Sequence, residues 1–344
     1  MFTHLKYLSS LFFPCCVAWF LLTGVHGTAE ALLWTLPLWF LILVDWLSPK
    51  IDPNQQKHLV ADWFYDSLLY TLSLLQFLII GLLLIYANQL QWGSVNQVAN
   101  SIVNLAVMRI LVGTTSGSSA IIVAHELIHR NQKHKRILGR LLLYSVCYEH
   151  FVIAHIRGHH LNVATPEDIA TARLGENFNH YWKRVYKEHF KYAWNFELNR
   201  LHQIHSSNLF ANSVLQGLLI EATLVILIIS TFGWAAAFIF SYQSLSAVRL
   251  LETINYYQHW GLEHGKATNS LAWVNQSSFT EYALIGLSNH ISHHQNASSP
   301  FYNTPYSELG PKMPYGYFVT NLWVKLNNES YQRVSTAILK EPVL

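Results

Sequence analysis

The chain has 344 residues, of which 51% are hydrophobic and only 12% are charged, about half the charged share of roughly 25% in soluble domains. This composition excludes a disordered chain and argues against an ordinary soluble domain. The formal net charge of +3 is too small for a surface that follows nucleic-acid phosphates, so we expect no nucleic-acid partner. The 19 histidines equal all Asp and Glu residues together and need an explanation.

Six long apolar stretches follow one another along the chain, and each approaches the ~20 residues that cross ~30 Å of hydrocarbon. They lie at about 9–25, 31–47, 67–88, 101–124, 213–232 and 234–254. None shows the alternation of a β-barrel strand, so we expect an all-α, polytopic integral membrane protein with six transmembrane helices. The first stretch follows Lys6 and has the alternative interpretation of a signal peptide.

Basic residues predict the orientation of these spans. The connections at about 26–30 and 89–100 and the turn near Gly233 contain no Lys or Arg, whereas every basic residue outside the spans lies on the side of the termini. The positive-inside rule then places both termini in the cytoplasm, most simply at a bacterial inner membrane. A further apolar run at about 137–154 is predicted as an interfacial or buried helix.

This topology leaves two large cytosolic segments, about 125–212 and 255–344, and we expect the chain 1–344 to form a single domain. Arg109 and Arg249 fall inside spans, where a charge is costly. We expect each to snorkel, to face the interior, or to pair with an acid, and the span residues Glu221 and Glu252 are possible partners.

Nine histidines fall into four groups, all in the expected cytosolic segments. They are His125 and His129 in HELIH, His155, His159 and His160 in HIRGHH, His259 in NYYQHWGL, and His290, His293 and His294 in HISHH. Residues i and i+4 share a helix face, so His125 and His129 point at one ion, and His155 and His159 repeat that spacing. His160 projects ~100° away, toward a second ion or a bridging position. Nine ligands exceed the three or four of a zinc site, so two metal ions are predicted.

Carboxylates near these groups are candidates for orienting the ligating rings. They are Glu126, Glu149, Asp168 and Glu263. His150 and His264 each flank one of the histidine groups. We interpret both as ordinary buried or surface residues, with orientation of the ligating rings as the alternative. His189 and the remaining histidines are interpreted as surface or core residues. HELIH also matches the HExxH signature of zinc proteases, in which Glu126 would be the general base. That interpretation leaves seven patterned histidines unexplained.

These motifs carry a resemblance to a known family. The stretches HELIHR (125–130), HIRGHHLNVATPEDIATAR (155–173), NYYQHWGL (255–262) and NHISHH (289–294) resemble the membrane-bound non-haem di-iron hydroxylases of the alkane 1-monooxygenase type, within the fatty acid desaturase superfamily. LVDWLSP (43–49) and MPYGYF (313–318) are also similar to that family. The resemblance covers about residues 30–320, and GHHxxVATPxD is its most specific part.

The resemblance implies that all nine histidines bind two iron ions at a cytosolic site that hydroxylates an alkyl chain with O₂. It also implies electrons from rubredoxin and rubredoxin reductase, here as separate proteins because the three cysteines form no CxxC pair. The sequence departs from the family at Ala154 and Gln258, where glutamates are usual. A fatty-acyl desaturase or hydroxylase on the same irons is the alternative.

An alkane has no polar group, so its chain length would be read by the depth of an apolar cavity. Trp34, Leu38 and Trp39 on the second span are candidates for setting that depth, although aromatic residues near membrane ends are also interfacial anchors. The basic stretches Lys133–Arg140 and Lys183–Lys191 are predicted to dock an acidic redox partner or to contact anionic lipid headgroups.

Overall fold

The computed structural model describes residues 3–54, 60–262 and 270–340, and within these ranges the secondary structure is helical apart from two isolated β-bridges. The bridges pair Lys50 with Ser277 and Val274 with Lys312. The elements, in chain order, are α1 (Thr3–Lys6), η1 (Tyr7–Leu11), α2 (Phe12–Leu22), α3 (Thr28–Leu33), α4 (Leu36–Trp46), α5 (Asp62–Asn88), α6 (Val95–Thr115), η2 (Ser116–Ala120), α7 (Ile121–Ile128), α8 (Lys133–Tyr144), α9 (Phe151–Ile153), η3 (Ala154–His159), α10 (His160–Asn162), α11 (Phe178–Gln203), η4 (Leu209–Ala211), α12 (Ser213–His259), α13 (Ser278–Ala283), α14 (His290–Gln295), α15 (Tyr317–Leu326) and α16 (Asn328–Lys340).

Five helical stretches among the described residues are long and apolar enough to cross a membrane. They are Thr3–Leu22, Thr28–Trp46, Asp62–Asn88, Val95–Ile128 and Ser213–His259. Each overlaps a predicted span, and the last contains two. Large apolar side chains are exposed along them, and Leu74, for example, has 69% of its surface exposed. This exposure is what a helix in contact with lipid requires.

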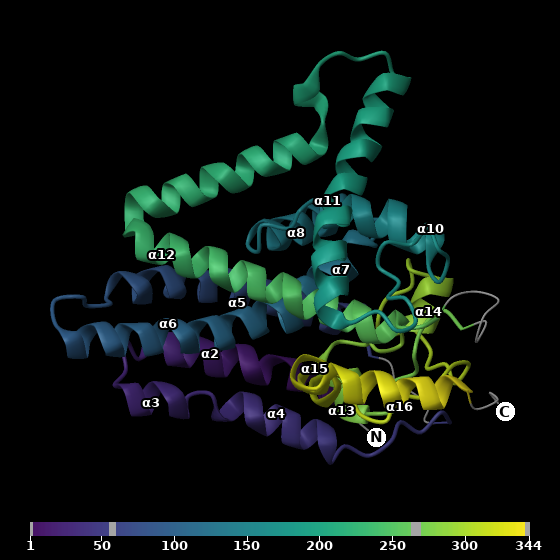
Figure 1. Cartoon of the computed structure of the whole chain (residues 1–344), viewed down its shortest axis with the longest axis horizontal. Coiled ribbons are helices and arrows are strands. Elements are labelled where there is room, and N and C mark those ends of the chain that lie inside the picture. The colour runs from purple at the N-terminus through teal and green to yellow at the C-terminus, as the bar shows by residue number, and fades with distance from the viewer. Residues whose placement is uncertain (1–2, 55–59, 263–269, 341–344) are drawn as a thin grey trace.

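The helix α12 is two helical arms joined at Gly233 (Figure 1). The backbone there has φ 81° and ψ 177°, a left-handed φ that glycine adopts without a steric penalty. The first arm lies over 213–232 and the second over 234–259, and the two diverge from the bend. The predicted turn at Gly233 is therefore confirmed, and the two predicted spans on either side of it lie in these arms.

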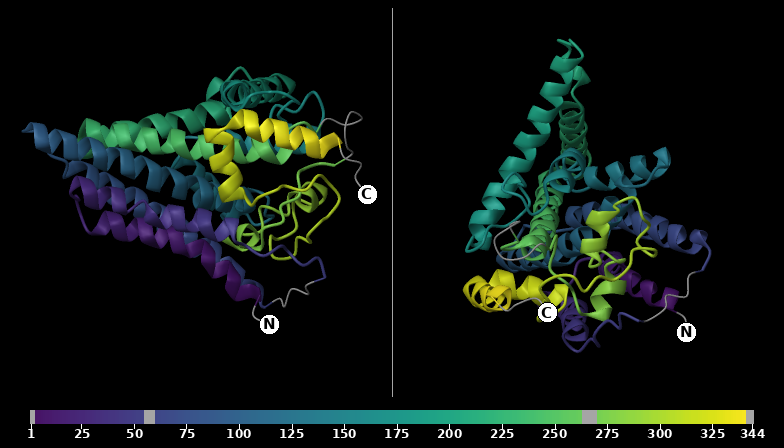
Figure 2. Two further views of the ribbon diagram at one scale, coloured as in Figure 1. Left: turned by 60° about the horizontal axis from the view of Figure 1, so that its bottom comes forward. Right: turned by 90° about the vertical axis from the view of Figure 1, so that its right-hand side faces the viewer.

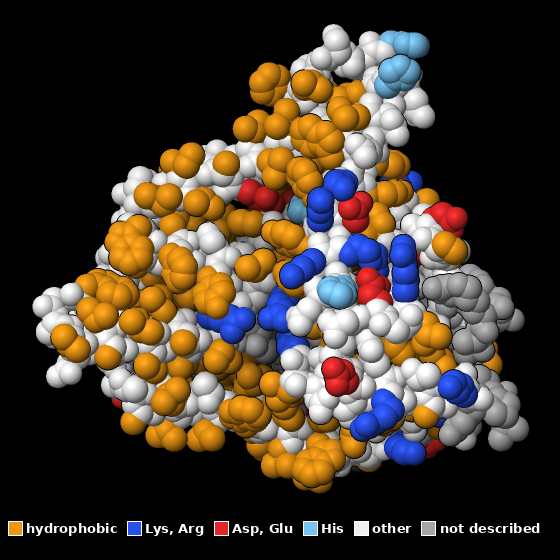
Figure 3. Space-filling model, in the orientation of Figure 1, with side chains coloured by type: hydrophobic (Ala, Val, Ile, Leu, Met, Phe, Trp, Pro, Cys, Tyr) orange, Lys and Arg blue, Asp and Glu red, His pale blue; other side chains and the backbone are white. Residues whose placement is uncertain are grey.

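The connections and the termini gather at opposite ends of the helices. In Figure 1 the links between α2 and α3 and between α5 and α6, together with the bend of α12, lie at the left. The two ends of the chain lie toward the other end, together with α14 (Figure 2). Hydrophobic side chains cover the left-hand part of the surface, and charged side chains gather to the right (Figure 3).

Two glycines bring α6 and η2 against the second arm of α12. A Cβ atom on Gly113 would lie 2.6 Å from Cβ of Ser246, and one on Gly117 would lie 2.7 Å from Cδ2 of Leu250. Small residues four apart allow this close approach of membrane helices. The contact fixes the position of HELIH, which follows in α7, relative to the end of α12.

The two outlying motifs LVDWLSP and MPYGYF meet around the buried carboxylate of Asp45. It accepts hydrogen bonds from Oγ of Ser277 (2.6 Å), Oγ1 of Thr280 (2.7 Å) and the backbone N–H of Val319 (3.1 Å). Gly316 lies so close to this carboxylate that a Cβ there would overlap it. Asp45 thus ties α4 to α13 and to the start of α15.

The predicted helix over 137–154 is wrong in its extent. α8 ends at Tyr144, and the chain turns through Cys147, which has a positive φ of 50°. Only the short α9 follows, before the second histidine motif begins. Because the chain turns after α8, the second histidine motif lies against α7.

Candidate metal centre

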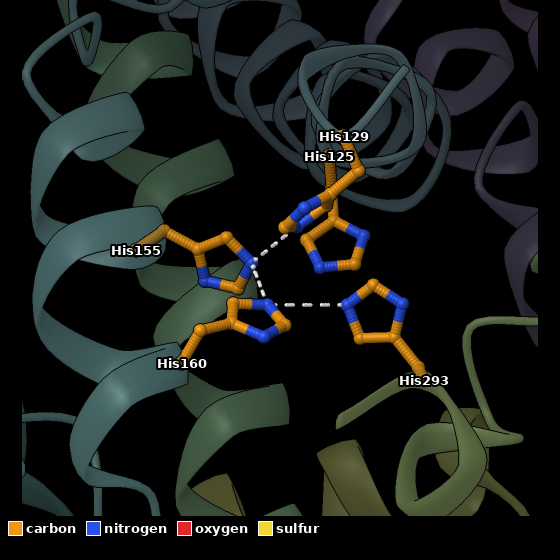
Figure 4. Close-up of side chains that lie close together, drawn as sticks. All are labelled: His125, His129, His155, His160 and His293. Atoms are coloured by element: carbon orange, nitrogen blue, oxygen red, sulfur yellow. Dashed lines mark hydrogen bonds between the residues drawn. The ribbon is translucent and has the colours of Figure 1, made fainter. Parts of the chain in front are cut away.

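The structure brings all nine patterned histidines together, and they divide into two groups. The first contains His125 and His129 from the end of α7, His155 and His160 from η3 and α10, and His293 from α14. In Figure 4 these five rings point toward one another from three separate helical segments. The Nε2 atom of His155 lies 3.1 Å from Nε2 of His129 and 3.0 Å from Nε2 of His160. The Nε2 atoms of His160 and His293 are 3.3 Å apart.

The second group contains His159, His259, His290 and His294. The Nε2 atom of His290 is at its centre, 3.1 Å from Nε2 of His259 and 3.0 Å from Nε2 of His294. The His159 ring approaches that of His160 in the first group, with 5.8 Å between the ring centroids. The two groups therefore adjoin.

The helix that carries the second motif distributes its histidines differently from the prediction. We expected His155 and His159 to share one ion, but His155 and His160 share the first group and His159 lies in the second. The reason is that η3 is a π-helix, in which residues five apart fall on one face. The i, i+4 spacing does hold for His125 and His129, which are joined in the first group.

Two rings are held in a fixed orientation by their outer nitrogen atoms. Nδ1 of His159 lies 2.8 Å from Oδ2 of Asp168, and Nδ1 of His259 lies 3.0 Å from the carbonyl oxygen of Leu271. Both acceptors select the tautomer with a proton on Nδ1, which leaves Nε2 unprotonated and facing the group. Asp168 also accepts a hydrogen bond from Oγ1 of Thr171 (2.7 Å).

Burial keeps these imidazoles neutral. Loss of water, followed by the neighbouring imidazoles, lowers the pKa of His129 and of His160 to about 2. The same causes lower the pKa of His155, His290 and His293 well below its usual range. Burial by itself would raise the pKa of Asp168, but the His159 ring and the hydrogen bonds from His159 and Thr171 lower it. A neutral imidazole presents the lone pair that a metal ion binds.

The donor set fits metal ions better than it fits a hydrogen-bonded core. Nε2 of His155 faces two other Nε2 atoms, and one ring proton cannot serve both contacts. Nε2 of His125 and of His159 is buried with no hydrogen-bond partner among the described residues. Metal–imidazole bonds of about 2.0–2.1 Å place neighbouring ligand nitrogens roughly 2.9–3.4 Å apart. The Nε2–Nε2 distances of 3.0–3.3 Å in both groups agree with that spacing.

Of the four carboxylates predicted to orient these rings, Asp168 alone among the described residues contacts one. Glu126 instead pairs with Arg130 and accepts the backbone N–H of Phe301 at 2.9 Å. Glu149 pairs with Arg140, with 2.6 Å between Oε1 and a guanidinium nitrogen. Glu263 lies outside the described residues.

A buried polar cluster beside the first group escaped the sequence analysis. Nδ1 of His189 lies 3.0 Å from the hydroxyl of Tyr148 and 3.3 Å from Oε1 of Glu252, to which Tyr148 also donates (3.1 Å). Phe151 stacks on both Tyr148 and His155 and so connects the cluster to the first histidine group. His189 was interpreted as an ordinary surface or core residue, and its wide separation in sequence from Glu252 offered no signal.

Comparison with known proteins identifies a family and several relatives of this chain. A profile of the family described as fatty acid desaturase matches residues 100–321. The alkane 1-monooxygenase 1 of Pseudomonas aeruginosa is 35% identical over 216 residues, which are 60% of this chain and 56% of that protein. The alkane 1-monooxygenase 2 of the same organism is 30% identical over 276 residues, or 77% of this chain and 71% of the relative.

A third relative is the xylene/toluene monooxygenase hydroxylase component XylM of Pseudomonas putida, which is 27% identical over 281 residues, 80% of this chain and 73% of its own. The chain spans little more than half the length of the first of these relatives. All nine patterned histidines lie inside residues 100–321, the part that the family profile matches.

Proposed function

The chain belongs to the fatty acid desaturase family, and on that premise we propose that it hydroxylates an alkyl chain with O₂, most simply the terminal methyl group of an alkane. The observation that carries the proposal is the pair of adjoining histidine groups, five and four rings with converging Nε2 atoms. In the overall reaction an alkyl C–H bond, O₂, two electrons and two protons give the alcohol and water.

We propose that the two groups hold two iron ions. Neutral imidazole suits iron as well as zinc, copper and nickel, and the family favours iron. The bound ions would supply the activation of O₂ that oxidation of an unactivated C–H bond requires. The chain's own part is to hold the nine rings, and Asp168 and Leu271 fix two of them in the ligating tautomer.

Apolar side chains enclose the histidines and keep water from them. Ile122 and Leu287 line two small cavities, each of about 10 Å³, that reach His125. Phe151 covers the His155 ring, with 4.8 Å between the ring centroids. An enclosure of this kind protects a reactive centre from side reactions with solvent and accepts only an apolar chain end.

We infer six membrane spans, with the two arms of α12 as the fifth and sixth, a cytosolic metal centre and both termini in the cytoplasm, as at a bacterial inner membrane. The absence of Lys and Arg from the links opposite the metal centre supports this orientation. We also propose that 1–344 acts as a single oxygenase domain, since one hydrophobic core contains residues from Tyr7 to Leu339.

We propose a rubredoxin, reduced by its reductase, as the electron donor. In the basic stretch of α11, Arg184 pairs with Glu176 and Lys191 with Glu188. Lys183 and Lys187 are exposed and form a positive surface for an acidic donor. The rate of reduction by the donor is then expected to fall as salt increases, and a rate independent of salt would contradict docking there.

The direct test is conversion of n-alkanes under ¹⁸O₂ by cells that express the chain with a rubredoxin and its reductase. We expect a primary alcohol with one ¹⁸O atom, detected by gas chromatography and mass spectrometry. His293→Ala should abolish the product and lower the iron content of the purified protein, because it removes a ligand of the first group. The matched control is His202→Ala, which removes an exposed histidine at the end of α11.

The products also separate the competing chemistry. A fatty-acyl product that is two hydrogens lighter and free of ¹⁸O would replace hydroxylation with desaturation. Protein that contains two iron ions and accepts electrons but forms no oxidised product from any alkyl substrate would overturn the proposal.

A further inference from the structure

A cavity of about 420 Å³ lies between α4, α6, α12 and α15, within the roughly 300–1,000 Å³ typical of small-molecule sites. Leu38, Ile42 and other apolar side chains form most of its wall. Three cationic side chains from three different helices also line it, namely Arg109, Arg249 and Lys325. In Figure 3 Lys and Arg side chains lie beside a hollow in the apolar surface.

The three cations have no acidic partner among residues 3–54, 60–262 and 270–340. Arg109 donates to Oγ of Ser246 at 3.1 Å, and Arg249 donates to Oδ1 of Asn179 at 3.5 Å. Within the described ranges, no Asp or Glu forms an ion pair with any of the three. Of the three alternatives for Arg109 and Arg249, pairing with the span acids Glu221 or Glu252 is therefore excluded.

Those acids are engaged elsewhere. Glu221 accepts the backbone N–H of Glu149 at 3.1 Å, and Glu252 belongs to the buried cluster with Tyr148 and His189. The Nε atom of Arg249 is buried and has no hydrogen-bond partner in the described part of the chain. A buried donor without a partner, on a cation that lines the same cavity as two other cations, is costly unless an anion occupies the cavity.

Lys325 lines the cavity with a side chain that is partly exposed, while burial removes water from its charged group. That loss of water, followed by the charges of Arg249 and Arg109, lowers the pKa of Lys325 to about 7. The three positive charges therefore destabilise one another when the cavity is empty. A bound anion would relieve this repulsion and keep Lys325 protonated.

The other end of the cavity approaches the metal centre. Ile254 lines the cavity and also a small apolar space whose wall includes His125, His155 and His290. Leu284 lines the cavity too, and Leu287, one turn farther along the chain, lines the small space. The cations thus lie at one end of an apolar path and the histidines at the other. The Ile254 side chain lies between the large cavity and the small apolar space.

We propose that this path binds a fatty acid, with its carboxylate at Arg109, Arg249 and Lys325 and its methyl end at the histidines. Resting on the proposed function, the inference makes the chain a terminal hydroxylase of fatty acids. The methyl C–H bond, O₂, two electrons and two protons would give the ω-hydroxy acid and water, and the carboxylate would remain unchanged. Here the polar end selects the substrate and the apolar path positions its far end.

The positions of these residues on α12 estimate the chain length. Arg249 and His259 lie ten residues apart on the helical second arm, so about 15 Å separates them along the helix axis. A fully extended peptide residue spans at most ~3.6 Å and contains three backbone bonds, which is about 1.2 Å per bond. We use the same advance per bond for the extended alkyl chain of the fatty acid. The interval therefore corresponds to about 12 bonds, and we expect acids of about 12 carbons or more to be preferred over shorter ones.

Binding is tested on the purified, iron-loaded protein by displacement of the fluorescent fatty acid cis-parinaric acid. In the unaltered protein dodecanoate should bind at least ten-fold more tightly than dodecan-1-ol, which has the same chain but no charge. Arg249→Gln and Lys325→Gln should each remove most of that preference. Arg333→Gln, which removes an exposed cation on α16, is the matched control and should keep it.

Turnover under ¹⁸O₂ then tests the orientation, with dodecanoate and dodecane compared in the same preparation. We expect ω-hydroxydodecanoate with one ¹⁸O at the new hydroxyl, and a dodecanoate-to-dodecane ratio of kcat/KM that falls at least ten-fold in Lys325→Gln. Iron content checks that each variant is folded and loaded. Lys325→Gln also guards against misfolding of the Arg249 variant, because its side chain is exposed.

The outcomes distinguish this inference from the function on which it rests. Oxidation of dodecane but not of dodecanoate would overturn the inference and leave the hydroxylase intact. Dodecanoate that binds without oxidation and is displaced by phosphatidylglycerol would identify an anionic lipid site instead. Failure of both substrates in iron-loaded, reducible protein would overturn the proposed function itself.

The binding assay also measures how dodecanoate affinity depends on pH. Arg109 from α6, Arg249 from α12, Tyr257 and Tyr317 also line the cavity, and Arg and Tyr side chains ordinarily titrate above the pH range of the assay. Lys325 alone therefore loses charge as pH rises from 6 to 8.5. We expect dodecanoate affinity to fall several-fold over that range, and to stay flat in Lys325→Gln.

Discussion

Asp168→Asn tests how the second histidine group is held together. The carboxylate accepts from Nδ1 of His159 at 2.8 Å and from Thr171 at 2.7 Å, and it is buried. The amide keeps the shape of the side chain but loses its charge. A hydrogen bond to a charged group contributes about 1.5–3 kcal/mol. Since 1.4 kcal/mol corresponds to a factor of ten, we expect metal affinity in this group to fall about 10- to 100-fold.

The assay is the iron content of the purified protein after dialysis against a graded series of chelator concentrations. In Asp168→Asn one of the two ions should be lost at about 10- to 100-fold lower chelator strength, and the ion of the first group should remain. Asp66→Asn is the control, because it removes another paired carboxylate, that of the Lys135 pair, away from the histidines. If both ions in Asp168→Asn dissociate at the same chelator strength as in the unaltered protein, the orienting role of Asp168 is refuted.

Three further predictions concern packing and orientation. Gly117→Ala should destabilise the protein by about 1–3 kcal/mol, because its Cβ would overlap α12, whereas Gly81→Ala, with open space around it, should not lower the midpoint of thermal unfolding in detergent. Gly316→Ala should lower the midpoint at least as much as Gly117→Ala does, since its Cβ would overlap the buried carboxylate of Asp45. An unchanged midpoint would show that this contact relaxes easily. In a variant without native cysteines, Asn96→Cys should react with an impermeant thiol reagent added outside intact cells and Lys312→Cys only after lysis; the reverse pattern would invert the proposed topology.

The histidine patterns predict much of this centre because they are local. His125 and His129 lie one α-helical turn apart, and that spacing alone is enough to place them together. Asp168 follows the second motif closely enough for the sequence to suggest it as a partner of that motif. Hydropathy likewise locates the apolar stretches, and the left-handed φ of Gly233 explains why two of them meet at one residue.

The remainder depends on contacts that no local pattern encodes. The carbonyl oxygen of Leu271 is a backbone atom, so its contact with His259 cannot be predicted from the residue type at position 271. Glu149 lies near the second motif in sequence, but the turn after α8 directs it to Arg140. That Arg249 forms no ion pair with Glu252 follows only from seeing that Glu252 is already engaged by His189. Each case is a competition among several partners, and tertiary packing decides it.

The π-helical turn η3 makes the metal centre sensitive to the length of the chain as well as to its composition. In an α-helix His155 and His160 would face about 140° apart, and only the wider turn lets both reach one group. Deletion of a single residue between them would restore α-helical spacing while leaving all nine histidines in the sequence. Such a chain would keep the histidine content of the motifs, but the division of these nine residues between the two groups would be lost.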